Sequence, residues 1–463
     1  MTYDLIIIGS GPGGYVAAIR ASQLGLRTAL VERAELGGVC LNWGCIPTKA
    51  LLKSAQVFEY LQHAADYGIV LEGRARPDLA AMVKRSRDVA AGMSKGVRYL
   101  MKKNGIDVIQ GHATLRTGGR VDVRSAEGAL DTLRSRHVII AVGARPRELA
   151  ALPRDGQRVI GCREAMSLTS QPASMVIVGA GAIGAEFASI YASLGTRVTL
   201  VETQARIVPL EEPEVSAQLQ RAFARRGVEV LTGATVEQVD KRPDGCTVRV
   251  ATPGGARELE CDIVLSAAGV TANLERLGLE EVGIATAGGR ITVDRWYQTS
   301  VPGYYAIGDC IPGAALAHVA SAEGVICVER IAGLDAEPLD YLNIPSCTYT
   351  QPELASVGYT EQAARADGYE VKTGTFPFSA SGKAQAAGHP EGFVKLVFEA
   401  RHGLLLGAHM VGANVTELIA EAVMARKLES TADELMKAVH PHPTMSEALM
   451  EAAAAAMGEA IHL

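Results

Sequence analysis

Short apolar runs alternate with amphipathic stretches over the first two thirds of the chain. Residues 5–8 form an apolar run of strand length, which is followed by a glycine turn, a helical stretch and a second apolar run that ends at Glu32. This order is typical of a strand–helix–strand unit in a parallel sheet. Residues 138–146, 263–269 and 299–310 are further segments in which a strand runs into a turn. The pattern predicts an α/β fold.

The pattern changes at about residue 343. Beyond it, alternating apolar residues and helical periodicity occur together, and the chain closes with a run of consecutive alanines that favours a helix. The expected elements are strands at 393–399 and 404–411 and helices at 415–426 and 432–438. An additional α+β domain at the C-terminal end follows from this mixture.

The first strand–helix–strand unit is repeated 170 residues later. Residues 5–32 and 175–202 align without a gap, and 11 of the 28 positions are identical. The shared motif comprises Gly9, Gly11, Gly14 and Glu32 in the first copy and Gly179, Gly181, Gly184 and Glu202 in the second. The glycines let a pyrophosphate approach the backbone, and the carboxylate can accept hydrogen bonds from ribose hydroxyls. Two copies predict two dinucleotides; one dinucleotide and a decayed relic is the weaker alternative, because neither copy has lost a glycine.

Cys40 and Cys45 stand five residues apart in the segment GGVCLNWGCIPTK. On an ideal helix their Cα atoms would lie roughly 8.6 Å apart, whereas a disulfide requires less than about 7 Å. A bridge would need a distorted turn, which the flanking glycines and Pro47 permit. Two unrelated buried thiols are the alternative. Because a dinucleotide motif precedes the pair so closely, we favour a redox-active disulfide beside a flavin.

Composition excludes several classes of protein. A length of 463 residues predicts two to four domains, and a net charge of −6 gives no basic footprint for nucleic acid. The longest apolar runs are too short for a membrane span, and the first strand begins without a preceding basic stretch, so we expect no membrane anchor or signal peptide. Eight cysteines are too few for a disulfide scaffold and lack the spacing of a zinc site. We therefore expect no metal and a reducing, cytoplasmic location.

These motifs resemble the lipoamide branch of the flavin-dependent pyridine-nucleotide disulfide oxidoreductases, from Tyr3 to about Ala452. The resemblance implies two Rossmann-like domains, with FAD on the first repeat and NAD on the second, and a C-terminal dimerisation domain. The implied boundaries are 1–146 and 270–342 for a discontinuous FAD-binding domain, 147–269 for the NAD-binding domain and 343–463 for the dimerisation domain.

The resemblance also assigns roles to individual residues. Cys45 would lie against the flavin, and Cys40 would face the substrate. In the segment HPHPTMSE, His442 would be a base that serves the disulfide of the other subunit, and Glu447 would orient its imidazole. His440 has no family role and is expected to be structural.

Further cofactor-binding residues follow from the same resemblance. Lys49 would lie near flavin N5 with Glu186 as its partner, and Asp309 would bind the ribityl and phosphate region of FAD. His318 would mark a helix N-terminus facing the flavin, although the chain lacks the lysine that the family has after this histidine. The two strand-to-turn segments contribute Gly143 and Gly269.

The activity implied is oxidation of protein-bound dihydrolipoyl groups with NAD⁺ as the acceptor. The implied partners are a second copy of the chain in a homodimer, and lipoyl domains with the acyltransferase of 2-oxo acid dehydrogenase complexes or the H protein of glycine cleavage. A glutathione-type reductase using NADPH is less favoured, because Glu202 would repel a 2′-phosphate. The absence of a terminal cysteine pair argues against a mercuric reductase, and the intact motifs argue against a scaffold without turnover.

Overall fold

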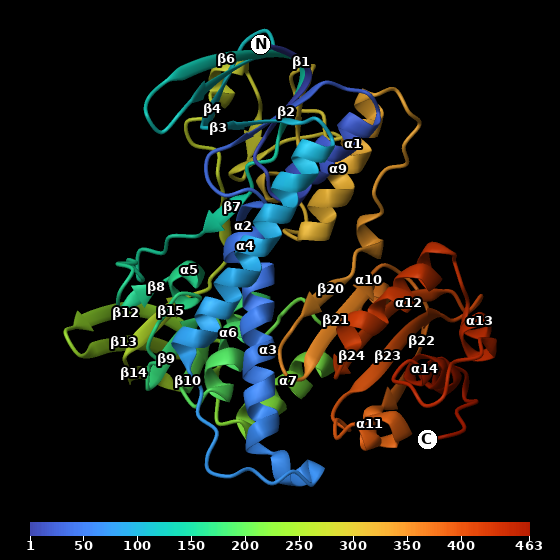
Figure 1. Cartoon of the computed structure of the whole chain (residues 1–463). Helices are drawn as coiled ribbons and strands as arrows, with labels where there is room; N and C mark the ends of the chain where they lie inside the picture. The colour runs from blue at the N-terminus through green and yellow to red at the C-terminus, as the bar shows by residue number, and fades with distance from the viewer.

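The computed structural model describes all 463 residues, and its first sheet has seven strands (Figure 1). The strands are β1 (Thr2–Ile8), β2 (Thr28–Glu32), β3 (Asp107–Gln110), β4 (His112–Arg116), β5 (Arg120–Arg124), β6 (Leu130–Ile140) and β19 (Tyr304–Ala306). They run in the order β3-β2-β1-β6-β5-β4, with β19 added to β6. β1 pairs in parallel with β2 and β6, and β19 pairs in parallel with β6. Segments on both sides of the second repeat therefore share one sheet.

Helix α1 (Pro12–Gln23) begins at the glycine turn of the first repeat and packs along α9 (Ala317–Ile331). Gly11 is extended at its N-cap, and a proline opens the first turn, where its missing N–H costs nothing. A Cβ on Gly324 would lie 2.7 Å from the carbonyl oxygen of Gly13. Because only glycine allows this approach, the later segment is held against the first repeat.

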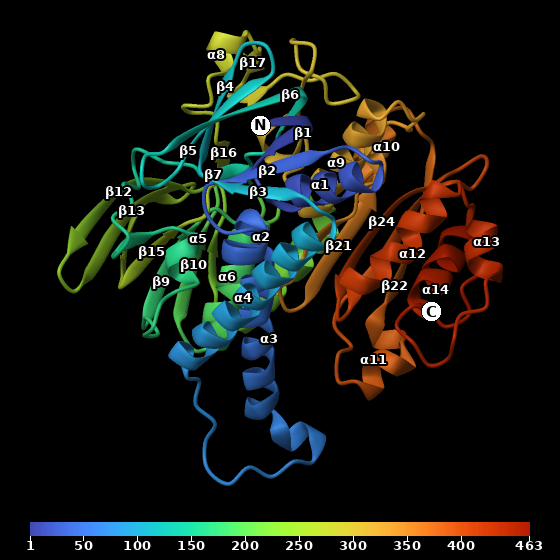
Figure 2. The same ribbon diagram turned by 45° about the horizontal axis from the view of Figure 1, so that its top comes forward.

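Three further helices lead from the first sheet toward the second (Figures 1 and 2). They are α2 (Gly38–Trp43), α3 (Cys45–Gln62) and α4 (Leu79–Lys103). Side chains of α3 and α4, among them Leu52 and Val83, belong to the hydrophobic core of the second sheet. The longest helix is α4 with 25 residues, and none of the helices combines the length and apolarity needed to cross a membrane.

The second sheet contains the second repeat. Its strands are β8 (Val159–Ile160), β9 (Ser174–Val178), β10 (Arg197–Val201), β11 (Glu229–Leu231) and β15 (Ile263–Ser266), in the parallel order β11-β10-β9-β15-β8. Its helices are α5 (Cys162–Ala165), α6 (Ala182–Ser193) and α7 (Pro213–Arg225). An antiparallel meander follows, comprising β12 (Thr235–Arg242), β13 (Gly245–Thr252) and β14 (Gly255–Cys261). The repeat thus reproduces the β1–α1–β2 unit as β9–α6–β10.

Two short strands mark where the chain passes between these units. β7 (Ala144–Pro146) and β16 (Val270–Ala272) pair in antiparallel fashion, with Ala144 opposite Ala272. They lie beside the boundaries expected at 146 and 270, and those boundaries stay a prediction. The remaining short elements are α8 (Leu279–Val282), β17 (Thr286–Ala287), β18 (Arg290–Ile291), η1 (Ala64–Tyr67), η2 (Gly308–Cys310), η3 (Tyr341–Asn343) and η4 (Phe378–Ala380).

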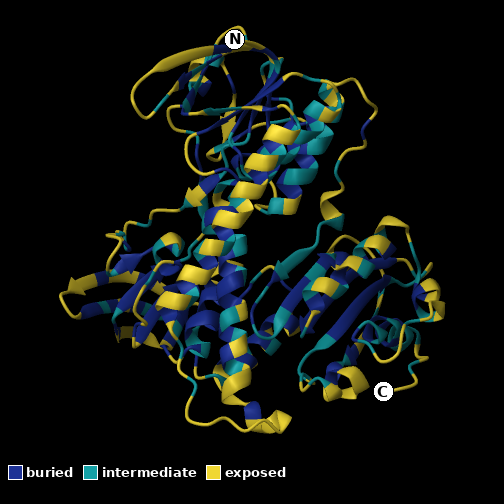
Figure 3. Cartoon of the chain, in the orientation of Figure 1, coloured by how far each residue is buried: buried dark blue, intermediate teal, exposed yellow.

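The third sheet is antiparallel and is covered by helices. Its strands are β20 (Ser346–Thr348), β21 (Glu353–Gly358), β22 (Val371–Pro377), β23 (Phe393–Glu399) and β24 (Leu405–Gly412), and its helices are α10 (Glu361–Ala366), α11 (Gly382–Ala386), α12 (Val415–Lys427), α13 (Ala432–Lys437) and α14 (Glu447–Met457). The ends of β24, α12 and α13 differ by one residue from expectation. Figure 3 shows buried strands and exposed residues on the helices. The final helix begins before the alanine run and ends at Gly458, whose φ of 77° is left-handed.

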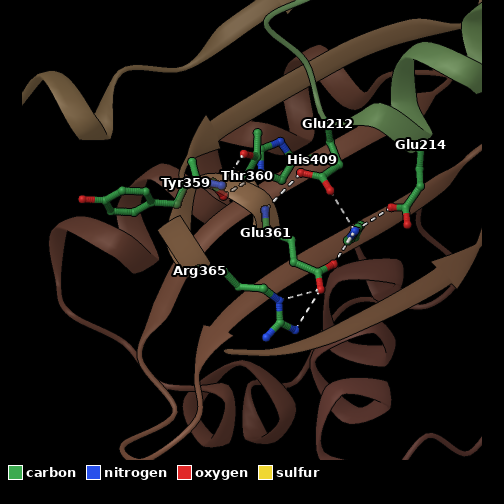
Figure 4. A network of polar contacts seen from close by, with 9 residues as sticks. Glu212, Glu214, Tyr359, Thr360, Glu361, Arg365 and His409 are labelled. Atoms are coloured by element: carbon green, nitrogen blue, oxygen red, sulfur yellow. Dashed lines mark hydrogen bonds and ion pairs between the residues drawn. The ribbon is translucent and has the colours of Figure 1, made fainter. Parts of the chain in front are cut away.

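A buried lysine joins the second and third sheets (Figure 4). The Nζ atom of Lys395, on β23, lies 2.9 Å from Glu212 Oε1, 2.6 Å from Glu214 Oε2 and 2.9 Å from Glu361 Oε2. Its side chain is only 3% exposed. Burial opposes its charge, but the three carboxylates raise its pKa. The start of α7 is therefore pinned to the third sheet by charge-assisted hydrogen bonds.

Candidate active site

The two cysteines lie on either side of a helix break. Cys40 is in α2, Cys45 opens α3, and Gly44 between them has φ −149° and ψ −116°. A Cβ on Gly44 would lie 3.1 Å from the carbonyl oxygen of Val39, which is tighter than most side chains tolerate. The backbone therefore makes the distorted turn that a contact between the two sulfurs requires.

The two thiols change each other's pKa. A hydrogen bond from Cys40 lowers the pKa of Cys45 to about 7, with burial opposing the shift and the charge of Lys49 supporting it. The same contact, together with burial, raises the pKa of Cys40. The contact with Cys40 and the charge of Lys49 therefore favour the thiolate form of Cys45 over that of Cys40.

Lys49 and Glu186 meet one helical turn beyond Cys45. The Nζ atom of Lys49 lies 2.8 and 3.0 Å from the two carboxylate oxygens of Glu186. It also lies 4.3 Å from the centroid of the Tyr349 ring, and the backbone N–H of Tyr349 donates to Glu186 at 2.9 Å. Glu186 is 7% exposed. Residues that are far apart in the sequence thus hold the ammonium group of Lys49 beside the Cys45 thiol. Lys49 and Glu186 are paired, as we expect from the sequence.

The glycines of both repeats fit a dinucleotide. A Cβ on the third glycine would lie 1.9 Å from the carbonyl oxygen of Gly9 in the first repeat, and 1.8 Å from that of Gly179 in the second. By contrast, a Cβ on the middle glycine, Gly11 or Gly181, would meet nothing within 4 Å. The middle glycines therefore face open space at a helix N-terminus, which is where a pyrophosphate binds.

Each repeat ends in a buried glutamate that organises the same turn. Glu32 accepts hydrogen bonds from the N–H and Oγ of Ser10 at 2.8 and 2.6 Å, and from the N–H of Ala34 at 2.8 Å. Glu202 accepts from the N–H groups of Ala180 and Gln204 at 2.7 and 2.8 Å. Each carboxylate is thus fixed at the carboxyl end of its strand. In folds of this kind the ribose of a dinucleotide binds at that edge of the sheet.

The remaining cofactor candidates lie at turns around the first two sheets. Asp309 is in η2, directly after β19, and burial raises the pKa of its carboxyl despite the opposing charge of Arg290. Gly143 and Gly269 follow β6 and β15 with φ of 65° and 89°. His318 lies in the first turn of α9, where its Nε2 is 2.9 Å from the carbonyl oxygen of Pro345. Its ring is thus engaged with the segment leading into the third sheet.

His442 and Glu447 form a dyad at the start of α14. The Nδ1 atom of His442 lies 2.8 Å from Glu447 Oε1, and the N–H of Thr444 donates to Glu447 Oε2 at 2.8 Å. Burial opposes the charge of Glu447, but the bonds from Thr444 and His442 hold its pKa below the usual range. The His442 side chain is 79% exposed. A fixed carboxylate therefore orients an imidazole whose other nitrogen is open to a substrate or partner.

The dyad and the cysteine pair are far apart within one chain. Figures 1 and 2 both place the third sheet between α2 and α14. The structure thus brings together Cys40, Cys45, Lys49 and Glu186, and it brings together His442 and Glu447, but it does not bring the two groups together.

Two contributors were missed in the sequence. Ser10 and Tyr349 support Glu32 and Lys49, and neither carries a signal of its own, because their partners are distant in the chain. His440, expected to be structural, is 6% exposed and its Nε2 lies 2.7 Å from Glu421 Oε1. Its ring is thus buried and bonded to an acid, which suits the structural role expected for it.

Comparisons with known proteins agree over the whole length. A model of the pyridine nucleotide-disulphide oxidoreductase family matches residues 3–324, and a model of that family's dimerisation domain matches 344–453. The dihydrolipoyl dehydrogenase of Rhizobium etli is 47% identical, covering 100% of this chain and 99% of the relative. That of Bacillus subtilis is 43% identical, covering 99% of both chains.

Solved structures agree as well. LpdA from Mycobacterium tuberculosis has a TM-score of 0.90 at 29% identity, covering 97% of this chain and 98% of its own. RclA from Escherichia coli, an HOCl-induced flavoprotein disulfide reductase, has a TM-score of 0.87 at 25% identity, covering 98% of this chain and 99% of its own. Sequence and structure comparisons thus point to the same group of redox proteins.

Proposed function

The chain belongs to the pyridine nucleotide-disulphide oxidoreductase family, and from that premise we propose how it works as a dihydrolipoyl dehydrogenase. It is an oxidoreductase that uses FAD and NAD and oxidises protein-bound dihydrolipoyl groups to lipoyl groups. The observation that carries this activity is full-length similarity to dihydrolipoyl dehydrogenases, joined to a pair of cysteines on either side of the helix break at Gly44.

The cysteines exchange electrons with the lipoyl group by thiol–disulfide chemistry. A thiolate of the dihydrolipoyl group attacks Cys40 of the Cys40–Cys45 disulfide, and Cys45 leaves as a thiolate. The second lipoyl thiol, once deprotonated, attacks the mixed disulfide, releases Cys40 and closes the lipoyl disulfide. Because the pKa of Cys45 is lowered to about 7, it is a good leaving group at neutral pH. The lipoyl dithiol loses two electrons and two protons, and the protein disulfide gains the electrons.

His442 and Glu447 act as base and orienting carboxylate in this exchange, and they serve the cysteines of the partner subunit. The dimerisation domain and the distance between the dyad and its own cysteines support this arrangement. An imidazole held by Glu447 can take the proton from the attacking lipoyl thiol and release it to solvent through its exposed edge.

FAD, when bound, would supply the electron transfer between the reduced cysteines and NAD⁺. Gly9, Gly11, Gly14 and Glu32 would hold its pyrophosphate and ribose side, and Asp309, Gly143 and His318 would complete the site. Lys49, fixed by Glu186, supplies positive charge beside Cys45. The NAD site comprises Gly179, Gly181, Gly184, Glu202 and Gly269.

The protein is a homodimer through its C-terminal domain. We assign its partners by chemistry: lipoyl domains and the acyltransferase of 2-oxo acid dehydrogenase complexes, or the H protein of glycine cleavage. A cytoplasmic location suits a catalytic disulfide that must cycle through its reduced form.

The cysteine roles are tested by two serine variants of the flavin-loaded enzyme. Cys40→Ser leaves a free Cys45 thiolate beside the flavin, so a long-wavelength thiolate–flavin absorbance should appear without any reductant. Cys45→Ser should abolish that absorbance under all conditions. The opposite assignment of the two spectra would reverse the roles.

The shared site is tested by mixing Cys40→Ser and His442→Gln chains after reversible dissociation. In a mixed dimer one site carries both defects and the other is intact, so about half the normal turnover per mixed dimer should return. Each parent dimer should be slowed by ~10²–10⁴, as expected for loss of a positioned base, or more for loss of Cys40. Mixed dimers that form without recovering activity would place the whole site in one chain.

A further inference from the structure

Two arginines enclose the tryptophan that lies between the cysteines. Trp43 is the last residue of α2, directly before the break at Gly44. The guanidinium carbon of Arg87, on α4, lies 3.9 Å from the centroid of the Trp43 ring, and that of Arg163, on α5, lies at the same distance. Both guanidinium groups are therefore within stacking distance of the indole.

Arg87 has few other partners, whereas Arg163 is exposed to solvent. An Nη1 atom of Arg87 is buried without a hydrogen-bond partner, and burial lowers the pKa of Arg87. The Nε1 of Trp43 donates to Glu35 Oε1 at 3.3 Å, which closes the cluster with one acid. Stacking on an aromatic face strengthens as the cation loses water. The ring is therefore the main partner of Arg87.

The same turn has a second contact with the segment that carries Arg163. The Oγ1 of Thr48 donates to the carbonyl oxygen of Gly44 at 2.7 Å and lies 3.3 Å from the sulfur of Met166, the residue that ends α5. Elements of the second sheet thus touch the turn just before Gly44 and four residues after it. Both contacts restrain the backbone that sets the separation of the two sulfurs.

We propose that Trp43 is a positioning residue for the cysteine pair, and the inference rests on the proposed function. Held by its contacts with Arg87 and Arg163, it fixes the turn at Gly44 and keeps the sulfurs of Cys40 and Cys45 close together. The Cys40–Cys45 disulfide and two glutathione thiols exchange to two protein thiols and one glutathione disulfide. The equilibrium constant of this exchange falls as the sulfurs are held closer together, because a fixed pair closes its disulfide at less entropic cost.

The test compares variants of the flavin-loaded dimer in glutathione redox buffers. After quenching, the peptide carrying both cysteines is alkylated and its reduced fraction is measured by mass spectrometry. Trp43→Ala should shift the exchange about tenfold toward the dithiol, as expected for the loss of two aromatic–guanidinium contacts. Trp43→Phe keeps an aromatic face for the guanidinium groups, so its equilibrium constant should lie close to that of wild type. Arg163→Ala removes one contact without emptying the Trp43 site, so it keeps the test decisive if Trp43→Ala does not fold.

Trp296 provides the matched control. It is the other tryptophan of the chain and also lies near two guanidinium groups, with Arg295 at 5.1 Å and Arg330 at 4.5 Å from its ring centroid. Trp296→Ala should leave the equilibrium constant of the glutathione exchange within about twofold of the wild-type value. The proposal is overturned if Trp43→Ala or Arg163→Ala stays within that range, or if Trp296→Ala shifts it equally. Since the readout involves neither lipoyl substrate nor NAD, wild type inactive toward dihydrolipoamide would contradict the proposed function alone.

Discussion

The two glycine repeats have the same backbone turn at the start of the helix, which we call the cradle. They differ in what surrounds this turn. In both, the first glycine has a φ of 100°, and the third lies against its carbonyl oxygen. The difference follows directly after the first glycine, where the first repeat has Ser10 and the second has Ala180. The Oγ of Ser10 donates to Glu32 and accepts from the N–H of Gly37 at 3.2 Å.

The first cradle is also packed against the segment that carries Cys40 and Cys45. A Cβ on Gly38 would lie 2.7 Å from the Cα of Gly11, so the start of α2 packs directly on the first turn. In the second repeat the loop at Val208 donates its N–H to the carbonyl oxygen of Ala180 at 2.8 Å, but a Cβ on Gly181 meets nothing within 4 Å and Ile183 is 45% exposed. We therefore expect the first glycine turn to hold its nucleotide enclosed beside the cysteines, and the second to leave its nucleotide more accessible to solvent.

The largest effect should come from the third glycines. Gly14→Ala and Gly184→Ala each force a Cβ onto a carbonyl oxygen less than 2 Å away, which costs about 3 kcal/mol or more of stability. Gly14→Ala should yield protein without FAD, whereas Gly184→Ala should keep FAD and lose NAD-dependent turnover. Absorbance of bound flavin and steady-state rates measure both.

Gly11→Ala and Gly181→Ala are the matched controls, because their Cβ atoms meet nothing in the protein. Both should melt close to wild type and lose only nucleotide affinity. If they unfold as readily as the third-glycine variants, the cradle does not face open space.

A smaller effect is expected at the two glutamates. Glu202→Ala should reduce the preference for NAD over NADP by about two decades, because it removes ribose hydrogen bonds and repulsion of a 2′-phosphate. Glu32→Ala should weaken FAD retention and leave that preference unchanged. The ratio of kcat/KM for the two nucleotides measures it, and a wild type that prefers NADP would contradict the role of Glu202.

The smallest effect should follow from exchanging the residues that distinguish the repeats. Ser10→Ala removes a hydroxyl with two partners and should cost about 1 kcal/mol in holoenzyme stability. Ala180→Ser adds a hydroxyl next to Glu202 and breaks no existing hydrogen bond, so its melting temperature should stay close to that of wild type. Equal losses in the two variants would show that the Gly37 contact is unimportant.

Much of this arrangement could be predicted because it depends on local pattern. The repeated glycines and strand-terminal glutamates predicted both glycine turns, and the cysteine spacing predicted a distorted turn between the cysteines. The third sheet differs from expectation by single residues at several ends. Contacts between distant segments could not be predicted in this way. Trp43 meets Arg87 and Arg163, and Lys395 meets three carboxylates, only because separate units pack together. No periodicity in the sequence records such contacts.

The most direct measurement is a steady-state comparison of wild-type enzyme with dihydrolipoamide and NAD⁺, and with glutathione disulfide and NADPH. The account predicts a kcat/KM at least about 10²-fold higher for dihydrolipoamide, since discrimination by a polar site commonly reaches that size. A protein that reduces glutathione disulfide with NADPH more efficiently than it oxidises dihydrolipoamide with NAD⁺ would contradict it.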